Sequence, residues 1–159
     1  MTYVRSILEF GSAIWMPYTE EYISKIESIQ KKFLLFALRH RYDPRNFRQL
    51  PSYEHRLEIL DLEKLSTRRD HASSIFIFNI LNGGIKSKDL SANVTLNENR
   101  QTRYSRYLNE CQSTKDYIVN SPLNKSIRLF NSFISCYNKE KIISVNCYRT
   151  NLKNMYNRR

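Results

Sequence analysis

The clearest pattern in the chain is a run of apolar residues spaced three or four positions apart between residues 19 and 38. Such spacing is typical of an amphipathic helix that packs one side against a core. Thr19 precedes Glu20 and Glu21, so we expect a hydroxyl-capped start with two carboxylates at the positive end of the helix dipole. The expected apolar side consists of Tyr22, Ile23, Ile26, Ile29, Phe33, Leu34, Ala37 and Leu38, and the expected polar side of Lys25, Gln30, Lys31 and Lys32.

Before this helix, apolar residues at helical spacing from Tyr3 to Leu8 predict the end of another helix. Gly11 and Pro17 then interrupt the pattern, which indicates a tight bend. Trp15 lies inside the bend. We expect its ring to be buried as the structural centre of a helical corner, with Pro17 marking the turn into the next helix.

Two more helices are predicted between residues 52 and 83. Ser52 is placed to cap a short helix over residues 52–60. Asp61 is expected to open a long helix, and Gly83 to end it, because glycine adopts the left-handed C-terminal conformation freely. The buried positions expected in the long helix are Leu62, Leu65, Ala72, Ile75, Phe76, Ile80 and Leu81.

Beyond Gly84 the pattern weakens. Residues 85–120 have few large aliphatic residues and many Asn, Ser, Thr and Arg, which predicts a loosely structured connection with a short helical turn near residues 86–90. Ser121 and Pro122 then predict a helix start. Its apolar side would consist of Leu123, Ile127, Phe130 and Ile134. From Tyr137 onward, the pattern fits either a continued helix or a fraying basic end.

These elements predict an all-α protein, a small bundle of about four to six helices with an irregular basic connection and a C-terminal helix. We divide the chain into a helical core over residues 1–85, the connection over 86–120, and a C-terminal helix with a basic tail over 121–159. A chain of 159 residues is long enough to bury a core without disulfides or bound metal.

Charge changes the picture more than composition does. The net charge is +11 and the isoelectric point is about 9.7, values at which phosphate-bearing partners are a physical expectation. Residues 1–80 carry 12 Lys and Arg against 10 Asp and Glu, whereas residues 81–159 carry 14 against 5. The net charges of the two halves are therefore +2 and +9, so the partner expected on these grounds is an RNA or DNA backbone bound by the second half.

Cysteine usage and hydropathy bear on the compartment. Cys111, Cys136 and Cys147 are odd in number and widely spaced, which favours reduced intracellular thiols over a disulfide framework or a zinc site. The longest apolar run, residues 33–38, is far shorter than the roughly 20 residues of a membrane span. We expect a cytoplasmic or nuclear protein that has no membrane partner.

The best candidate for ligand binding interleaves arginine and tyrosine within the basic connection. Guanidinium groups pair with phosphates, and aromatic rings stack on unpaired bases, so this pattern suits single-stranded or A-form nucleic acid. The alternative is a solvated basic linker. The residues concerned are Arg100, Arg103, Tyr104, Arg106 and Tyr107.

A second candidate follows the amphipathic helix of residues 19–38. It is a basic loop that contains aromatic residues and a proline, and its alternative is a helix end whose cations complement the C-terminal dipole. Its candidate phosphate ligands are Arg39, Arg41, Arg45 and Arg48.

The sequence contains no pattern that predicts catalysis. His40, His55 and His71 each lack a second ligand at metal spacing, so we expect polar surface or capping residues. The cysteines lack a nucleophile signature, and Gly83 and Gly84 follow a helix instead of opening one. We therefore expect no catalytic residues, no metal and no cofactor.

Several short strings, taken in order, resemble one region of a known protein family. The first reads VRSILEFGSAIWMPY over residues 4–18. Others lie at residues 26–34, 50–56, 77–83, 122–125 and 128–131. Their order and spacing resemble the segment downstream of the polymerase palm in non-LTR (LINE-like, Jockey-type) retrotransposon reverse transcriptases, which looks like a thumb with its C-terminal extension.

This resemblance implies a thumb-like core over residues 1–85 and a parent polyprotein that is an RNA-directed DNA polymerase. It implies binding to template and primer and to the parent's catalytic palm. The family's paired palm aspartates are missing, because the chain contains no Asp-Asp pair, and so is the Cys/His knuckle of many relatives. We expect a non-catalytic fragment. The alternative is a helical protein-interaction module or an inactive retroelement remnant that has no nucleic-acid role.

Overall fold

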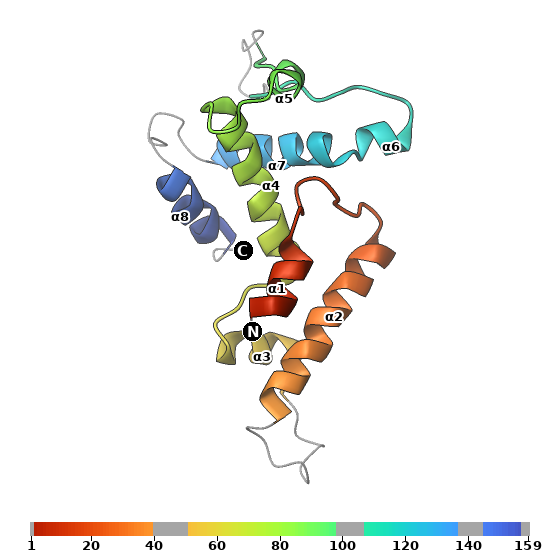
Figure 1. Cartoon of the computed structure of the whole chain (residues 1–159), viewed down its shortest axis with the longest axis vertical. Coiled ribbons are helices and arrows are strands. Elements are labelled where there is room, and N and C mark those ends of the chain that lie inside the picture. The colour runs from red at the N-terminus through yellow and green to blue at the C-terminus, as the bar shows by residue number, and fades with distance from the viewer. Residues whose placement is uncertain (1, 40–50, 98–106, 137–144, 157–159) are drawn as a thin grey trace. The chain divides into compact units, whose positions relative to one another are not determined.

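The computed structural model of the chain describes residues 2–39, 51–97, 107–136 and 145–156. Within these ranges the fold is all-α, as predicted, and a single isolated antiparallel bridge joins Leu96 to Leu108 (Figure 1). More helices are present here than expected: inside the predicted connection, α5 overlaps the helical turn expected near residues 86–90, and α6 was not predicted. They are α1 (Thr2–Glu9), α2 (Glu20–Arg39), α3 (Tyr53–Ile59), α4 (Leu65–Leu81), α5 (Lys88–Asn93), α6 (Asp116–Val119), α7 (Pro122–Cys136) and α8 (Val145–Tyr156).

The chain forms two compact units. The first unit comprises residues 1–10 and 17–68, and the second unit comprises residues 11–16 and 69–159. Along the chain, the first unit ends within α4, at Arg68, and the rest of α4 belongs to the second unit. This division differs from the expected segments 1–85, 86–120 and 121–159, because most of α4 packs with the connection and α7.

The first unit has a small apolar core on one side of α2. Leu34, Tyr53 and Leu57 are its buried members, and α3 begins as predicted with the Ser52 hydroxyl accepting a hydrogen bond from the His55 backbone N–H at 3.2 Å. The buried side of α2 differs from the prediction. Tyr22 and Ile29, both expected to be buried, are 58% and 48% exposed. The buried residues of α2 are Leu34 and Leu38, as expected, and Gln30, which was expected on the polar side.

The reason is a polar network beside that core. Gln30 Nε2 donates to the Tyr53 hydroxyl at 2.9 Å, and the same hydroxyl donates to the Glu27 carboxylate. Arg68 Nη2 donates to Gln30 Oε1 at 2.5 Å, and Arg68 Nε forms a 2.9 Å ion pair with Glu9. Hydrogen-bonded polar groups can be buried at little cost, so α2 turns a polar residue inward.

The caps of the neighbouring helices correct two further predictions. Asp61 adopts a left-handed backbone with φ of 50° and closes α3, with backbone bonds from Asp61 to Glu58 and from Leu62 to Leu57. Helix α4 begins later, at Leu65, where the Glu27 carboxylate accepts the N–H groups of Leu65 and Ser66 at 3.1 Å. A distant side chain, not Asp61, therefore caps α4.

Thr19 does not act as the predicted cap. It stands directly before α2, but its buried hydroxyl has no hydrogen-bond partner among the residues that the structure describes. The two carboxylates of Glu20 and Glu21 do occupy the first turn of α2, as expected.

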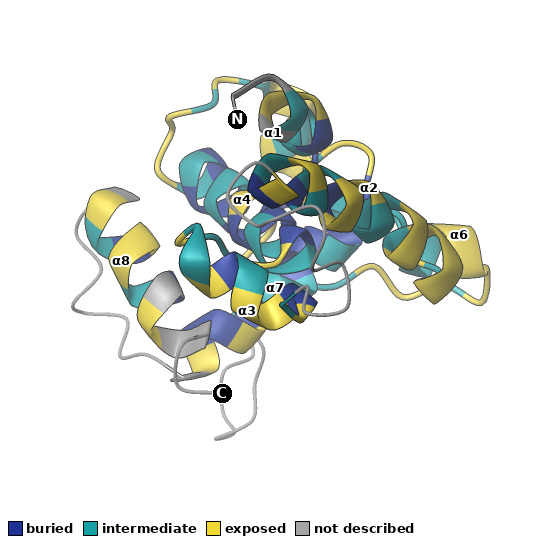
Figure 2. Ribbon diagram, turned by 90° about the horizontal axis from the view of Figure 1, so that it is seen from below, coloured by how far each residue is buried: buried dark blue, intermediate teal, exposed yellow. Residues whose placement is uncertain are grey.

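Aromatic packing dominates the core of the second unit. Tyr148 of α8 is fully buried, and its ring centroid lies 4.6 Å from Phe78, 4.5 Å from Phe133 and 5.8 Å from Phe130. Its hydroxyl forms a 2.5 Å hydrogen bond with Ser74. Buried positions run along α4, α7 and α8 (Figure 2). Residues 145–156 thus form a separate packed helix, which is neither a fraying end nor part of α7.

Helix α7 follows the prediction closely. Pro122 is its first residue, and Ser121 Oγ accepts the Asn124 N–H at 3.4 Å. Its predicted apolar residues all contribute to the core, namely Leu123, Ile127, Phe130 and Ile134. Gly83, with φ of 70°, ends α4 as predicted.

Two buried asparagines on α7 hold the described parts of the connection. The Asn131 amide exchanges two hydrogen bonds with the backbone of Leu108, at 2.8 and 3.0 Å. Asn124 does the same with Cys111, at 3.1 and 3.3 Å, and also donates to the Val119 carbonyl at 2.9 Å. Each amide replaces a missing backbone partner, so the described ends of the connection are ordered against α7 rather than loose.

Trp15 is not the buried centre of the bend. Its side chain is 44% exposed, whereas Arg69 beneath it is only 4% exposed. The Arg69 guanidinium lies 4.0 Å from the indole centroid and donates to the Trp15 carbonyl at 2.7 Å. Gly11 has φ of 63°, and a Cβ there would lie 3.2 Å from the indole. The ring therefore covers a buried cation. Pro17, next in the bend, is partly buried.

Candidate nucleic-acid interface

Two of the nine predicted nucleic-acid-binding residues lie in the described part of the chain, Arg39 and Tyr107. Arg41, Arg45, Arg48, Arg100, Arg103, Tyr104 and Arg106 lie outside the described residues, as does His40.

Tyr107 stands at the end of a short backbone ladder. Its carbonyl accepts the Asn97 N–H at 3.1 Å, and the Asn109 N–H donates to the Thr95 carbonyl at 3.0 Å. Its ring lies 5.9 Å from Phe130 and is half-buried. Tyr107 therefore contributes to the second unit's core. The ladder holds Thr95 and Asn97 beside Tyr107 and Asn109.

Arg39 is the last residue of α2 and is exposed. A cation in this place stabilises the negative end of the helix dipole. Its position agrees with the helix-end alternative and leaves the guanidinium exposed on the first unit.

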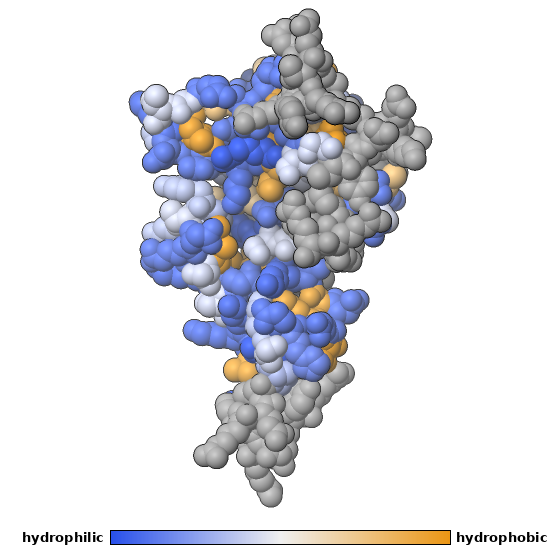
Figure 3. Space-filling view, turned by 180° about the vertical axis from the view of Figure 1, so that it is seen from behind, coloured by the Kyte–Doolittle hydropathy of each residue, from blue (hydrophilic) through white to orange (hydrophobic). Residues whose placement is uncertain are grey.

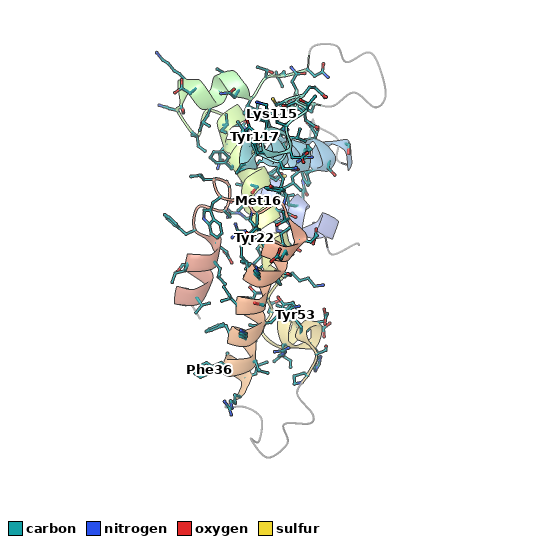
Figure 4. All side chains as sticks on the ribbon, turned by 90° about the vertical axis from the view of Figure 1, so that its right-hand side faces the viewer. Met16, Tyr22, Phe36, Tyr53, Lys115 and Tyr117 are labelled. Atoms are coloured by element: carbon teal, nitrogen blue, oxygen red, sulfur yellow. The ribbon has the colours of Figure 1, made fainter. Side chains whose placement is uncertain are left out.

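An exposed cation and ring that the sequence reading did not single out lie close together in the second unit. Lys115 Nζ lies 6.0 Å from the ring centroid of Tyr117, whose side chain is 65% exposed (Figure 4). An exposed aromatic face beside an ammonium can stack on a base while the cation meets a phosphate. The signal in the sequence is Lys-Asp-Tyr, a pattern too short to stand out alone. Asp116 between them is exposed as well.

Helix α7 and its neighbours hold this pair in place. Arg128 Nη2 donates to the Val119 carbonyl at 3.1 Å and to Asn120 Oδ1 at 3.3 Å, at the C-terminal end of α6. Asn124 donates to the same carbonyl. These bonds engage the Arg128 guanidinium in the structure, so its role is to position α6.

A second cation of this unit is also engaged. Asp70 is largely buried, and burial raises the pKa of its carboxyl, while the charges of Lys125 and Arg69 oppose that rise. Lys125 is thus partly committed to Asp70. The exposed cations among the described residues of the second unit are Lys86, Lys88, Lys115 and Arg149.

The charge of the two units is unequal. The first unit contains 11 Lys and Arg against 9 Asp and Glu, and the second contains 15 against 6. The net charges are +2 and +9. The face shown in Figure 3 is mostly hydrophilic where it is described, with separate hydrophobic patches between.

The described residues provide little for chemistry. No group of three His, Cys, Asp or Glu side chains that could hold a metal ion occurs among them. His55 is exposed and lies 3.2 Å from Glu58, as expected of a surface residue, but His71 is 8% exposed, contrary to the expectation. Within the same ranges, no helix has the length and apolar character required to cross a membrane.

Comparison of the chain with protein-family models, with curated proteins and with solved structures found no match. The candidate interface therefore stands on its own charges, exposure and geometry.

Proposed function

We propose that the chain binds the backbone of RNA or DNA through its second unit, and that it is a non-catalytic post-palm segment of a non-LTR retrotransposon reverse transcriptase. The single observation that carries the binding proposal is the +9 net charge of the second unit against +2 in the first. A surplus of cations on one unit attracts polyanions by releasing their condensed counterions.

The exposed pair Lys115 and Tyr117 supports an unpaired strand as the ligand. Stacking of a base on an exposed aromatic ring is worth about 1–3 kcal/mol and needs a base whose face is accessible. Duplex bases are stacked on each other and do not offer that face. The proposal therefore places single-stranded RNA or DNA above duplex DNA in affinity.

The proposed origin rests on the ordered sequence strings from residue 4 to residue 131. In the parent enzyme this segment would hold template and primer, while aspartates of the palm, encoded outside this chain, bind the metal ions and perform polymerisation. The proposal makes the parent's palm a further partner. It also implies a cytoplasmic or nuclear location, where such nucleic acids occur.

Fluorescence anisotropy of labelled single-stranded RNA, single-stranded DNA and duplex DNA, each titrated with the full chain at several salt concentrations, tests the proposal. We expect affinity to fall steeply with salt, with a slope of about −0.7 per neutralised phosphate on single strands. Absence of binding, or binding that does not change with salt, would contradict electrostatic recognition.

A matched pair of variants locates the interface. Tyr117→Ala should weaken single-strand binding by about fivefold or more, since stacking of roughly 1–3 kcal/mol is lost, and Tyr117→Phe should retain it. Lys115→Ala should also make the fall of affinity with salt concentration less steep. Lys25→Ala in the first unit changes the net charge equally, but Lys25 is exposed and already paired with Glu21 at 2.6 Å, so this control should bind as the parent chain does.

A further inference from the structure

A single asparagine of α7 holds both ends of an exposed segment in the second unit. At one end, Asn124 Oδ1 accepts the Cys111 N–H at 3.1 Å, and Asn124 Nδ2 donates to the Cys111 carbonyl at 3.3 Å. At the other end, the same Nδ2 donates to the Val119 carbonyl at 2.9 Å. One buried amide therefore closes residues 111–119 into a loop, which we call the 111–119 loop.

Further hydrogen bonds order this loop from within. Ser113 Oγ accepts the Lys115 N–H at 3.2 Å, and the Lys115 carbonyl accepts the Val119 N–H at 3.2 Å within α6. Arg128 of α7 gives the Val119 carbonyl a second donor, at 3.1 Å. A carbonyl oxygen has two lone pairs, so both acceptor positions of Val119 are occupied. The backbone of the loop is thus held at both ends and across α6.

The loop carries the two exposed side chains of the candidate interface. Lys115 Nζ lies 6.0 Å from the ring centroid of Tyr117, which is 65% exposed (Figure 4). Asn124, in contrast, is only 4% exposed, and its amide is engaged with the backbone. A nucleic acid cannot reach it. Any influence of Asn124 on binding must therefore act through the position of the loop.

We infer that Asn124 is a positioning residue of the nucleic-acid site, an inference that rests on the proposed binding by Lys115 and Tyr117. It closes the 111–119 loop in advance, so that the ammonium and the ring meet a phosphate and a base without ordering of the chain at the moment of binding. Ordering a loop on binding costs affinity, and preorganisation removes that cost. Asn124 thereby raises the affinity of a site that it does not touch.

The chain contains a matched control for this role. Asn131, two turns later on the same helix, is 8% exposed and exchanges two hydrogen bonds with the backbone of Leu108, at 2.8 and 3.0 Å. Its amide makes the same kind of contact, but with a residue that precedes the 111–119 loop. Asn124→Ala and Asn131→Ala should both lower the free energy of unfolding, because each leaves buried backbone groups unpaired. Only Asn124→Ala should weaken binding.

A double-mutant cycle tests the inference, with labelled single-stranded oligouridylate as the probe in fluorescence anisotropy at low salt. Asn124→Ala should raise the dissociation constant at least about fivefold, and Asn131→Ala less than about twofold. In a chain that carries Lys115→Ala and Tyr117→Ala together, the loop has nothing left to position, so Asn124→Ala should change the dissociation constant less than about twofold. Equal losses in the two backgrounds, or equal losses for the two asparagine variants, would overturn the inference.

The outcomes separate this inference from the proposal beneath it. If the chain does not bind the probe, or if loss of Lys115 and Tyr117 has no effect, the proposed site fails and the positioning role fails with it. If that loss weakens binding but Asn124→Ala does not, the site stands and only the positioning role is refuted.

Two further measurements cover variants that lose stability. Amide exchange should rise across the 111–119 loop in Asn124→Ala and not in Asn131→Ala, and an unchanged loop would contradict the inference. Circular dichroism verifies folding. If Asn124→Ala does not fold, Arg128→Lys takes its place in the cycle: it keeps the charge but loses the planar fork that joins Val119 and Asn120, and its smaller loss of affinity should also vanish without Lys115 and Tyr117. An equal loss in both backgrounds would again refute the role.

Discussion

The interiors of the two units are stabilised by different kinds of contact. The first unit surrounds a few apolar side chains with a hydrogen-bonded group made of Glu27, Gln30, Tyr53 and Arg68. The second unit packs Phe78, Phe130, Phe133 and Tyr148 ring against ring, and the one hydroxyl pair among them, Tyr148 with Ser74, is buried. Burial of aromatic area contributes more stability than polar bonds that merely replace bonds to water.

The comparison also has a functional side. The first unit is nearly neutral, whereas the second is strongly basic and buries the rings of Phe78, Phe130, Phe133 and Tyr148. The proposed polyanion binding accordingly belongs to the second unit. The following changes test whether the interiors differ in the way described.

The largest effect is expected from Phe133→Ala. Phe133 is fully buried and meets Tyr148 edge to face at 4.5 Å, so truncation leaves a cavity and should lower the free energy of unfolding by about 3–5 kcal/mol. Denaturant unfolding measures the loss, and amide exchange should rise in α4, α7 and α8. Ser132→Ala, at the exposed neighbouring position, is the control. A loss below that of a surface change would mean that the rings do not dominate.

The next effect is expected from Glu27→Ala. The change removes the acceptor for the N–H groups of Leu65 and Ser66 and for the Tyr53 hydroxyl. Three donors lose a charged acceptor, which should cost about 2–3 kcal/mol. Amide exchange at Leu65 and Ser66 should increase most. Glu58→Ala, an exposed carboxylate of the same unit, is the control; equal losses would show that the cap has no stabilising role.

Tyr53 should make the first unit sensitive to alkali. Burial, and then its hydrogen bond to Glu27, raise the pKa of the Tyr53 phenol well above the ordinary value. Since the unfolded chain releases this proton near pH 10 or so, the stability contributed by Tyr53 is fully present below that pH and is lost as pH rises further. Unfolding free energies between pH 8 and 11 should fall more steeply for the parent chain than for Tyr53→Phe. Parallel curves would exclude the effect.

The smallest expected effect is a gain in stability. Asp61 holds φ of 50°, where a side chain is strained and glycine is not. Asp61→Gly should therefore stabilise the chain by about 0.5–1 kcal/mol, whereas Asp61→Ala, which keeps the Cβ, should give no gain. Thermal unfolding resolves the two. A loss with glycine would indicate that the carboxylate itself stabilises the α3 turn.

Local patterns in the sequence predicted several elements well. Ser52, Pro122 and Gly83 mark helix ends in both the pattern and the structure, because each acts through its own backbone neighbourhood. The apolar side of α7 was predicted for the same reason, since period and packing coincide there.

Features that depend on distant residues escaped prediction. Glu27 caps a helix that begins 38 residues later, and no local rule connects the two. Gln30 is buried because its partners Tyr53 and Arg68 come from elsewhere, which rotates the covered side of α2 away from Tyr22 and Ile29. Periodicity therefore identified the helix but not which of its sides is covered.

The candidate interface was also predictable only where it depends on local sequence. The charge asymmetry could be read from the sequence alone. The packing of Tyr107 on Phe130 and the exposure of Tyr117 could not, because both depend on how α6 and the connection lie against α7.

The interleaving of the two units has a consequence for biosynthesis. Residues 11–16 leave the ribosome early, yet the contacts of Trp15 with Arg69 and of Met16 with Ser73 join residues 54 and 57 positions apart. This bend can reach its final environment only after α4 has been translated. A nascent chain halted before that point would carry an indole without its guanidinium.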